Sequence, residues 1–310
     1  RSTLFPYTTL FRSEVKITHL ITEKRNQKTM GLDEMSICSF LKVMNEEDST
    51  VAESVKKALP EIEEAVKHII EALNNNGRLI YIGSGTSGRL GVLDAVECPP
   101  TFGTTTEVIG LIAGGPSAFV KAKEGAEDEK EQGAKDIVDA RVKSNDVVVG
   151  IAASGRTPHT IGALEKAKEI GAFTVSLSCN PNSEVGKIAD IAIEVEVGPE
   201  VITGSTRLKA GTAQKLVLNM LSTASMVGIG KTYQNLMVDM KATNLKLIER
   251  SKRIIMEATG CTYETASIKF EESDRECKVA IIMVLLDCSK EEAVKRLNAS
   301  KGFVKKAINN

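Results

Sequence analysis

The sequence has no marked excess of either charge and no long apolar run. Lysine and arginine total 40 of its 310 residues against 41 aspartates and glutamates. No overall field therefore attracts nucleic acid or an anionic membrane. The longest apolar stretches, such as residues 279–286, are far shorter than the roughly 20 residues that a membrane span requires. We expect a cytoplasmic protein that binds small molecules, not nucleic acid or membrane.

The sequence also lacks any cluster of metal-binding residues. Its six cysteines include no C-x-x-C pair, which argues against a zinc module and against a secreted disulfide framework. His19, His68 and His159 are far apart, and His68 falls in an amphipathic helical pattern, where histidines are more often structural. We expect neither a metal nor any other cofactor, so the chemistry rests with carboxylates.

The composition, 42% hydrophobic and 26% charged residues, suits one large core with a smaller unit. Residues 1–13 differ from the rest and resemble a translated sequencing-library adapter, which predicts a non-native leader. The alternative is a targeting peptide, although its apolar stretch is short and is interrupted by Pro6. We expect an α/β domain over residues 14–240 and a helical domain over residues 241–310.

Five short β-rich runs alternate with helical patterns after residue 77, which predicts a five-stranded parallel sheet flanked by helices. The predicted strands are 78–82, 107–112, 146–152, 173–178 and 191–197. Helices are predicted at 33–47, 51–73, 89–96, 134–142, 161–170, 183–188 and 206–229. A small bundle follows, with helices at 242–258, 263–270, 277–286 and 290–297. Ligands of such sheets bind at the carboxyl ends of the strands.

Two turns at that edge carry the tripeptide Ser-Gly-Arg. Residues 83–89 read Gly-Ser-Gly-Thr-Ser-Gly-Arg, and residues 153–158 read Ala-Ser-Gly-Arg-Thr-Pro. Each turn presents hydroxyls beside the N-terminus of a predicted helix, whose unpaired N–H groups and dipole favour an anion. The predicted ligand-binding residues are Ser84, Gly85, Thr86, Ser87, Ser154 and Thr157. For the side chains of Arg89 and Arg156, a salt bridge and a ligand contact are equally open.

The first turn also matches G-x-G-x-x-G, through Gly83, Gly85 and Gly88, which raises dinucleotide binding as a competitor. Such a site places an acid about 20 residues on, at the end of the second strand. Here the only acid of that strand, Glu107, lies at its other end. The hydroxyls suit a phosphate monoester better, and no G-K-[ST] follows that would make a P-loop.

Two glutamates stand near the predicted strand ends. Glu97 is expected to end its helix just before Pro99 and Pro100, where the negative helix end disfavours an acid. Glu127 lies in the polar segment 124–128. From the residues alone, a solvated surface charge is the commoner role for each.

Longer motifs show a family resemblance. Residues 83–89 resemble the phosphosugar loop of the sugar isomerase (SIS) domain family. Residues 198–209, Gly-Pro-Glu-Val-Ile-Thr-Gly-Ser-Thr-Arg-Leu-Lys, resemble the signature shared by bacterial N-acetylmuramic acid 6-phosphate etherases and the animal glucokinase regulatory protein. The similarity to the etherase family runs from about residue 21 to residue 304 and includes the segments around Glu97 and Glu127.

The resemblance implies an SIS domain with a ubiquitin-associated-like helical tail. It also implies cleavage of the lactyl ether of N-acetylmuramic acid 6-phosphate to N-acetylglucosamine 6-phosphate and D-lactate, in cell-wall recycling. Glu97 and Glu127 match the family's catalytic pair. By that match, Glu127 takes the C2 proton, and Glu97 protonates the leaving lactate oxygen and then activates water.

The spacing of the motifs bears on assembly. Glu97 follows Thr86 by eleven residues, roughly 16 Å along a helix, which is more than one hexose easily bridges. We therefore expect a homodimer in which Glu97 acts on sugar held by the partner. Two other functions stay open. One is a non-catalytic sugar-phosphate sensor, although the chain has only one SIS unit. The other is an aldose–ketose isomerase, which the glutamate contexts match poorly.

Overall fold

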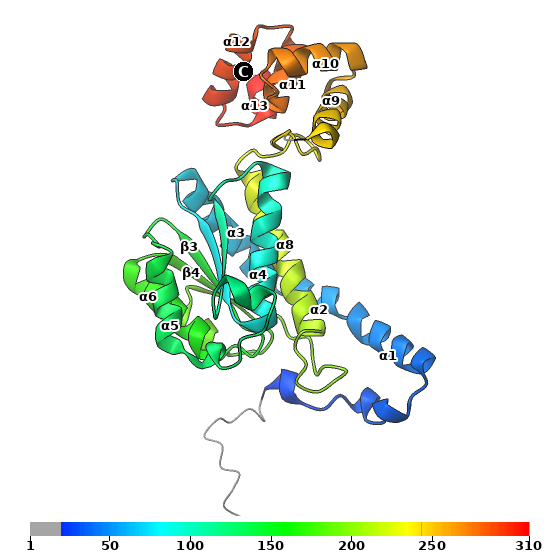
Figure 1. Cartoon of the computed structure of the whole chain (residues 1–310), viewed down its shortest axis with the longest axis vertical. Helices are drawn as coiled ribbons and strands as arrows, with labels where there is room; N and C mark the ends of the chain where they lie inside the picture. The colour runs from blue at the N-terminus through cyan, green and yellow to red at the C-terminus, as the bar shows by residue number, and fades with distance from the viewer. Residues whose placement is uncertain (1–19, 243, 310) are drawn as a thin grey trace, which may run out of the picture.

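The computed structural model describes residues 20–242 and 244–309, so the predicted leader lies outside the described residues. Its centre is a five-stranded parallel sheet of order β2-β1-β3-β4-β5. Strands β3 and β4 of this sheet are labelled in Figure 1. The strands are β1 (Leu79–Gly83), β2 (Val108–Ile112), β3 (Val147–Ile151), β4 (Phe173–Ser178) and β5 (Ile191–Glu194). The five predicted strands are confirmed, with ends that differ by at most three residues.

The sheet is the middle of three layers, because alternate residues of its strands face two separate cores. Tyr81 and Val149 face the core that includes α2 (Val51–Lys57), α3 (Leu59–Asn74), α4 (Gly85–Phe102) and α8 (Lys209–Gly228). Ile80 and Val148 face the core that includes α5 (Lys130–Asp139), α6 (Pro158–Ile170) and α7 (Glu184–Ile188). Burial on both faces explains why β1 and β3 are continuous apolar runs.

The parallel register brings the two Ser-Gly-Arg turns to one edge of the sheet. Gly83, the last residue of β1, pairs with Ile151 at the end of β3 and with Ile112 at the end of β2. The segments that follow these three strands therefore begin side by side, as ligand sites of parallel sheets require.

One predicted helix is divided in the structure. The pattern over residues 51–73 predicts a single helix, but α2 ends at Lys57 and α3 begins at Leu59. Pro60 lies in the first turn of α3, where its missing N–H costs no intrahelical bond. The apolar periodicity continues across the break, which is why the pattern did not show it.

The expectation that Glu97 ends its helix is wrong. Helix α4 continues to Phe102, and Pro99 and Pro100 lie inside its last turns. Although the two prolines lack N–H groups, the end of the helix is closed in other ways. The Thr101 hydroxyl donates to the Glu97 carbonyl at 2.9 Å, and the N–H of the left-handed Gly103 donates to the Pro99 carbonyl at 2.9 Å.

The C-terminal helices form a separate bundle, seen at one end of the molecule in Figure 1. They are α9 (Leu245–Thr259), α10 (Tyr263–Glu272), α11 (Cys277–Leu286), α12 (Lys290–Ala299) and α13 (Val304–Asn309). Their core contains Ile255, Phe270 and Ile281 and is joined by Tyr233 and Val238 of the connecting segment. The short α13 was not predicted, and the domain division at residue 240 stays a prediction. No helix among the described residues has the length and apolarity to cross a membrane.

Candidate functional site

A pocket of about 270 Å³ opens at the carboxyl edge of the sheet, and we call it the edge pocket. It is lined by the turn after β1, the segment after β2 and the 3-10 turn η5 (Ala126–Asp128). Its lining residues include Ser84, Gly85, Arg89, Lys123 and Glu127. The structure therefore brings two of the predicted ligand-binding residues together with one of the two predicted catalytic glutamates.

The turn after β1 is shaped to receive an anion. Ser84 is buried, yet its hydroxyl has no hydrogen-bond partner among the described residues. Gly85 begins α4 with a φ of +53°, a left-handed conformation that strains other residues, and its position is open to approach. The first N–H groups of a helix have no partner within the helix, so they are available to a ligand here.

The third glycine of the motif serves packing. A Cβ on Gly88 would lie 2.4 Å from the carbonyl oxygen of Gly83, so only glycine lets α4 begin this close to β1. Close packing of strand and helix therefore accounts for this glycine without a dinucleotide.

Two cations hold the wall of the edge pocket. Arg89 donates through Nε to the Phe119 carbonyl at 2.9 Å and through Nη2 to the Ala118 carbonyl at 2.8 Å. Lys123 donates through Nζ to the Gly114 carbonyl at 2.6 Å. These bonds fix the segment after β2 and place two positive charges at the pocket. This anchoring role of Arg89 was not predicted, because the sequence does not show which carbonyls fold against it.

The other residues of the first turn lie between α4 and α8. The Ser87 hydroxyl is buried and donates to Oε1 of Gln214 at 3.0 Å. Thr86 is half-buried beside Gly211. Neither residue lines the edge pocket, so their predicted contact with a ligand remains a prediction.

The second turn carries Ser154 and Thr157 after β3. The Ser154 hydroxyl accepts from the N–H of Arg156 at 3.4 Å, and Thr157 precedes the first turn of α6. Arg156 also makes an ion pair with Glu184, with Nη2 at 3.9 Å from Oε1. The two hydroxyl residues do not line the edge pocket, although their strand end is paired with that of β1.

Glu97 lies in a different pocket, which we call the helix pocket. Its volume is about 540 Å³, and it lies among α4, α8 and the connecting segment 232–237. Its lining residues include Asp94, Glu97, Lys215, Asn219 and Gln234. The structure thus does not bring Glu97 and Glu127 into one pocket of a single chain.

Asp94, which lines the helix pocket, is buried and makes two polar contacts. Asp94 accepts from the Tyr81 hydroxyl at 3.0 Å and from Nζ of Lys215 at 3.3 Å. Burial, and then the charge of Asp94, raises the pKa of Tyr81 well above 10. The same two causes raise the pKa of Cys98 to about 12. Both groups therefore stay neutral at pH 7, and Cys98 is not a thiolate nucleophile.

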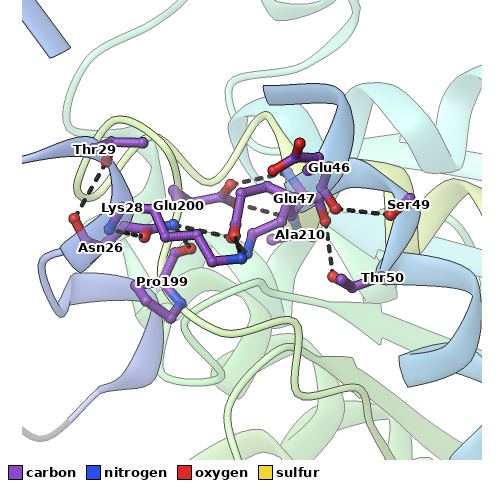
Figure 2. A network of polar contacts seen from close by, with 11 residues as sticks. Asn26, Lys28, Thr29, Glu46, Glu47, Ser49, Thr50, Pro199, Glu200 and Ala210 are labelled. Carbon is purple, nitrogen blue, oxygen red and sulfur yellow. Dashed lines mark hydrogen bonds and ion pairs between the residues drawn. The ribbon is translucent and has the colours of Figure 1, made fainter. Parts of the chain in front are cut away.

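The segment 198–209 joins α8 to the N-terminal region (Figure 2). Glu200 is fully buried and accepts the N–H groups of Lys209 and Ala210 at 2.9 Å each, which caps the start of α8. Burial raises the pKa of Glu200, although these two hydrogen bonds oppose the shift.

Lys209 in turn pairs with Glu47 of α1 (Ile37–Ser49), with Nζ at 2.6 Å from Oε2. Lys28 and Asn26 donate to the same carboxylate at 2.8 and 2.9 Å. Burial alone raises the pKa of Glu47, but the hydrogen bonds from Lys209 and Lys28 outweigh it and lower that pKa to about 2. This part of the motif joins α1 to the start of α8, and none of Glu47, Glu200 and Lys209 lines the edge pocket.

The two described histidines contact protein groups. His159 is fully buried, with Nε2 at 2.8 Å from Oδ2 of Asp136. His68 stacks on Phe173, with ring centroids 3.8 Å apart. The part of the chain that the structure describes holds no group of three or more histidine, cysteine or acidic side chains suited to a metal ion.

Two family models identify an SIS domain in this chain. The SIS domain model matches residues 126–224, and the model of the glucokinase regulatory protein N-terminal SIS domain matches residues 61–168. A phosphoheptose isomerase from Francisella tularensis is similar in structure, with a TM-score of 0.48 and 18% identity over 62% of this chain and 98% of that one.

Proteins of similar sequence show which family of SIS-domain proteins the chain belongs to. The chain is 59% identical over 293 residues to an N-acetylmuramic acid 6-phosphate etherase of Bacillus cereus, covering 94% of this chain and all of that protein. It is 58% identical over 296 residues to N-acetylmuramic acid 6-phosphate etherase 2 of Enterococcus faecalis, covering 95% of this chain and all of that protein. The chain therefore belongs to the N-acetylmuramic acid 6-phosphate etherase family.

Proposed function

We propose that the protein is a carbon–oxygen lyase that cleaves the lactyl ether of N-acetylmuramic acid 6-phosphate. The products are N-acetylglucosamine 6-phosphate and D-lactate, as cell-wall recycling in the cytoplasm requires. The observation that carries the proposal is the edge pocket, where the partnerless Ser84 hydroxyl, the start of α4 and Glu127 line one space of about 270 Å³. The near full-length relatives carry the name of this activity.

The reaction needs one base and one acid. Opening of the sugar ring exposes a C1 aldehyde, which acidifies the proton on C2. Glu127 takes that proton, the C2–C3 double bond forms, and the C3–O bond breaks with its electron pair going to the lactyl oxygen. Glu97 protonates that oxygen. Glu97 then takes a proton from water as hydroxide adds at C3, and protonated Glu127 returns its proton to C2, so both glutamates recover their starting states.

The binding residues hold the phosphate and the sugar so that C2 lies at Glu127. Ser84 and the N–H groups from Gly85 onward bind the phosphate, and Thr86 and Ser87 border it. Ser154 and Thr157 bind sugar hydroxyls from the neighbouring strand end. Correct positioning of this kind supplies much of the rate of an otherwise slow elimination.

Glu97 requires a second copy of the chain, because it lines the helix pocket and not the edge pocket. The outer surface of α4 supports such a contact. Val96, next to Glu97, is 56% exposed, and Val120 is 89% exposed. With Val92 and Phe119 they line a largely apolar hollow of about 610 Å³. Exposed apolar surface of this kind is typical of an interface, so we propose a homodimer with shared active sites.

Lactate release tests the proposal. Purified protein incubated with N-acetylmuramic acid 6-phosphate is expected to release D-lactate and N-acetylglucosamine 6-phosphate in equal amounts, and Glu127→Gln is expected to abolish most of that release. Substrate binding without lactate release would indicate a sensor. Interconversion of aldose and ketose phosphates without lactate would indicate an isomerase. Either result would overturn the proposed reaction.

A further inference from the structure

The helix pocket contains a single positive charge beside the proposed proton donor. Among its described lining residues Lys215 is the only basic one, and the acidic ones are Asp94 and Glu97. The remaining polar lining includes the amide side chains of Asn219 and Gln234. At about 540 Å³ the pocket has room for a small polar group.

Lys215 is held in place at the base of this pocket. Its Nζ lies 3.3 Å from Oδ1 of Asp94, and the other oxygen of Asp94 accepts from Tyr81. Asp94 is buried, whereas one third of the Lys215 side chain stays exposed. An ammonium group has three N–H donors, so the bond to Asp94 leaves donors for a ligand in the pocket.

Lys215 and Glu97 line the same pocket. Asp94 and Glu97 are three residues apart on α4, and such residues are neighbours on one face of a helix, with Cβ atoms about 5–6 Å apart. The residue that fixes the Lys215 ammonium is therefore a neighbour of Glu97 on α4.

The charge of the leaving group favours a cation at this place. The lactyl group carries a carboxylate on the same carbon that bears the ether oxygen. An acid that protonates that oxygen must lie within hydrogen-bond reach of it, so the carboxylate lies only a few ångströms further on. The cations of the edge pocket line a different space, and Arg89 and Lys123 there bond to backbone carbonyls.

We propose that Lys215, oriented by Asp94, binds the carboxylate of the lactyl group, so that the helix pocket is a subsite for a 2-hydroxy acid. The inference rests on the proposed function and adds the recognition of the leaving group. Asn219 and Gln234 supply neutral donors beside the cation. Lys215 selects substrates that carry this carboxylate, and it positions the ether oxygen at Glu97.

The charges change in a direction that favours release. While Glu97 is protonated, as a proton donor must be, it does not repel the lactyl carboxylate. After Glu97 has given up its proton, two carboxylates stand beside one ammonium that Asp94 already partly neutralises. Like charges within one pocket repel each other. This repulsion favours departure of lactate before water adds.

The test compares two substrates. One is N-acetylmuramic acid 6-phosphate, and the other is its lactyl carboxamide, which has nearly the same shape but no charge. Because a charge-assisted hydrogen bond is stronger than a neutral one, we expect the wild type to have a kcat/KM about 10- to 100-fold higher for the parent substrate than for the carboxamide. In Lys215→Met we expect this preference to fall to nearly 1, and in Lys215→Arg we expect it to persist.

Lys231→Met is the matched control, because Lys231 also pairs with an aspartate, Asp239 at 2.9 Å, but does not line the helix pocket. It should keep the wild-type preference. An equal loss for both substrates in Lys215→Met would show a purely structural lysine and overturn the inference, as would a wild type without preference. If Lys215→Met does not fold, the ratio of kcat/KM for the two substrates is measured in Lys215→Gln, and a ratio near 1 is expected there as well. A wild type that releases no lactate from the parent substrate contradicts the proposed function itself, which is a separate outcome.

Discussion

The edge pocket and the helix pocket differ in the chemical groups that line them. The edge pocket has a helix N-terminus, a partnerless hydroxyl and two cations anchored to carbonyls, all suited to a phosphate. The helix pocket has two carboxyl groups and one lysine, suited to proton transfer and to a small acid. Helix α4 begins at the first pocket and carries Glu97 eleven residues beyond Thr86, roughly 16 Å away along its axis. In the proposed function, phosphate recognition and leaving-group chemistry are therefore divided between two ends of one helix.

The sharpest way to test this division is to remove each carboxylate in turn. Glu97→Gln and Glu127→Gln keep the shape of the side chain but cannot act as acid or base, so we expect turnover to fall by about 10²- to 10⁴-fold in each. Binding of the sugar phosphate should stay near the wild-type level. Steady-state lactate release and calorimetric binding measure the two quantities. A near-native rate in either variant would remove that glutamate from the mechanism.

Mixing these two inactive variants tests whether the pockets meet across an interface. Random exchange of subunits makes half of the dimers mixed, and each mixed dimer has one site with both glutamates intact, so about a quarter of the wild-type activity should return. Each variant refolded alone is the control. Failure to recover activity in dimers shown to be mixed would mean that both glutamates act from the same chain.

Loss of the buried pair between Lys209 and Glu47 should affect both pockets equally, through folding. Lys209→Met leaves a buried carboxylate without its main partner, and we expect about 3–5 kcal/mol less free energy of unfolding. Lys28→Met removes an exposed partner of the same carboxylate and should cost much less than Lys209→Met, because solvent screens an exposed ion pair. Denaturant titration of the two variants checks the difference, and equal losses would contradict it.

The pH dependence of stability should show the same pair. The pKa of Glu47 is lowered from 4.5 to about 2 in the folded protein. Its contribution to stability is therefore fully present above pH 4.5 and is lost as the pH falls from 4.5 toward 2. Over that range, Glu47→Gln should lose less stability than the wild type does. Identical pH profiles of stability for the variant and the wild type would show that the pKa of Glu47 is not lowered.

Ser84→Ala should affect ligand binding at the edge pocket and leave stability unchanged. The hydroxyl has no partner in the free protein, so its removal should leave the melting temperature nearly unchanged. Loss of one hydrogen bond to a charged phosphate should raise KM by about 10- to 100-fold with little change in kcat. An unchanged KM would mean that Ser84 does not face the phosphate.

Much of the fold followed from local patterns. The strands were predicted to within three residues because each is a short apolar run closed by a turn, a pattern that the parallel sheet with helices on both faces produces. The helix break at Ala58 was missed because the spacing of apolar residues continues unchanged from α2 into α3. The extent of α4 was also missed, because Pro99 and Pro100 normally end a helix. Here the helix continues to Phe102, and Thr101 and Gly103 bond to carbonyls of its last turns.

The sequence by itself determined the layered α/β fold, the two turns at one sheet edge and the residue types that a phosphate and an acid–base reaction need, because each follows from the spacing of neighbours along the chain. Only the tertiary structure decided which groups share a space. It placed Ser84 and Glu127 in one pocket and Glu97 and Lys215 in another, and it paired Lys209 with Glu47 of α1. These pairings join residues up to 162 positions apart, and no local pattern encodes how distant segments pack.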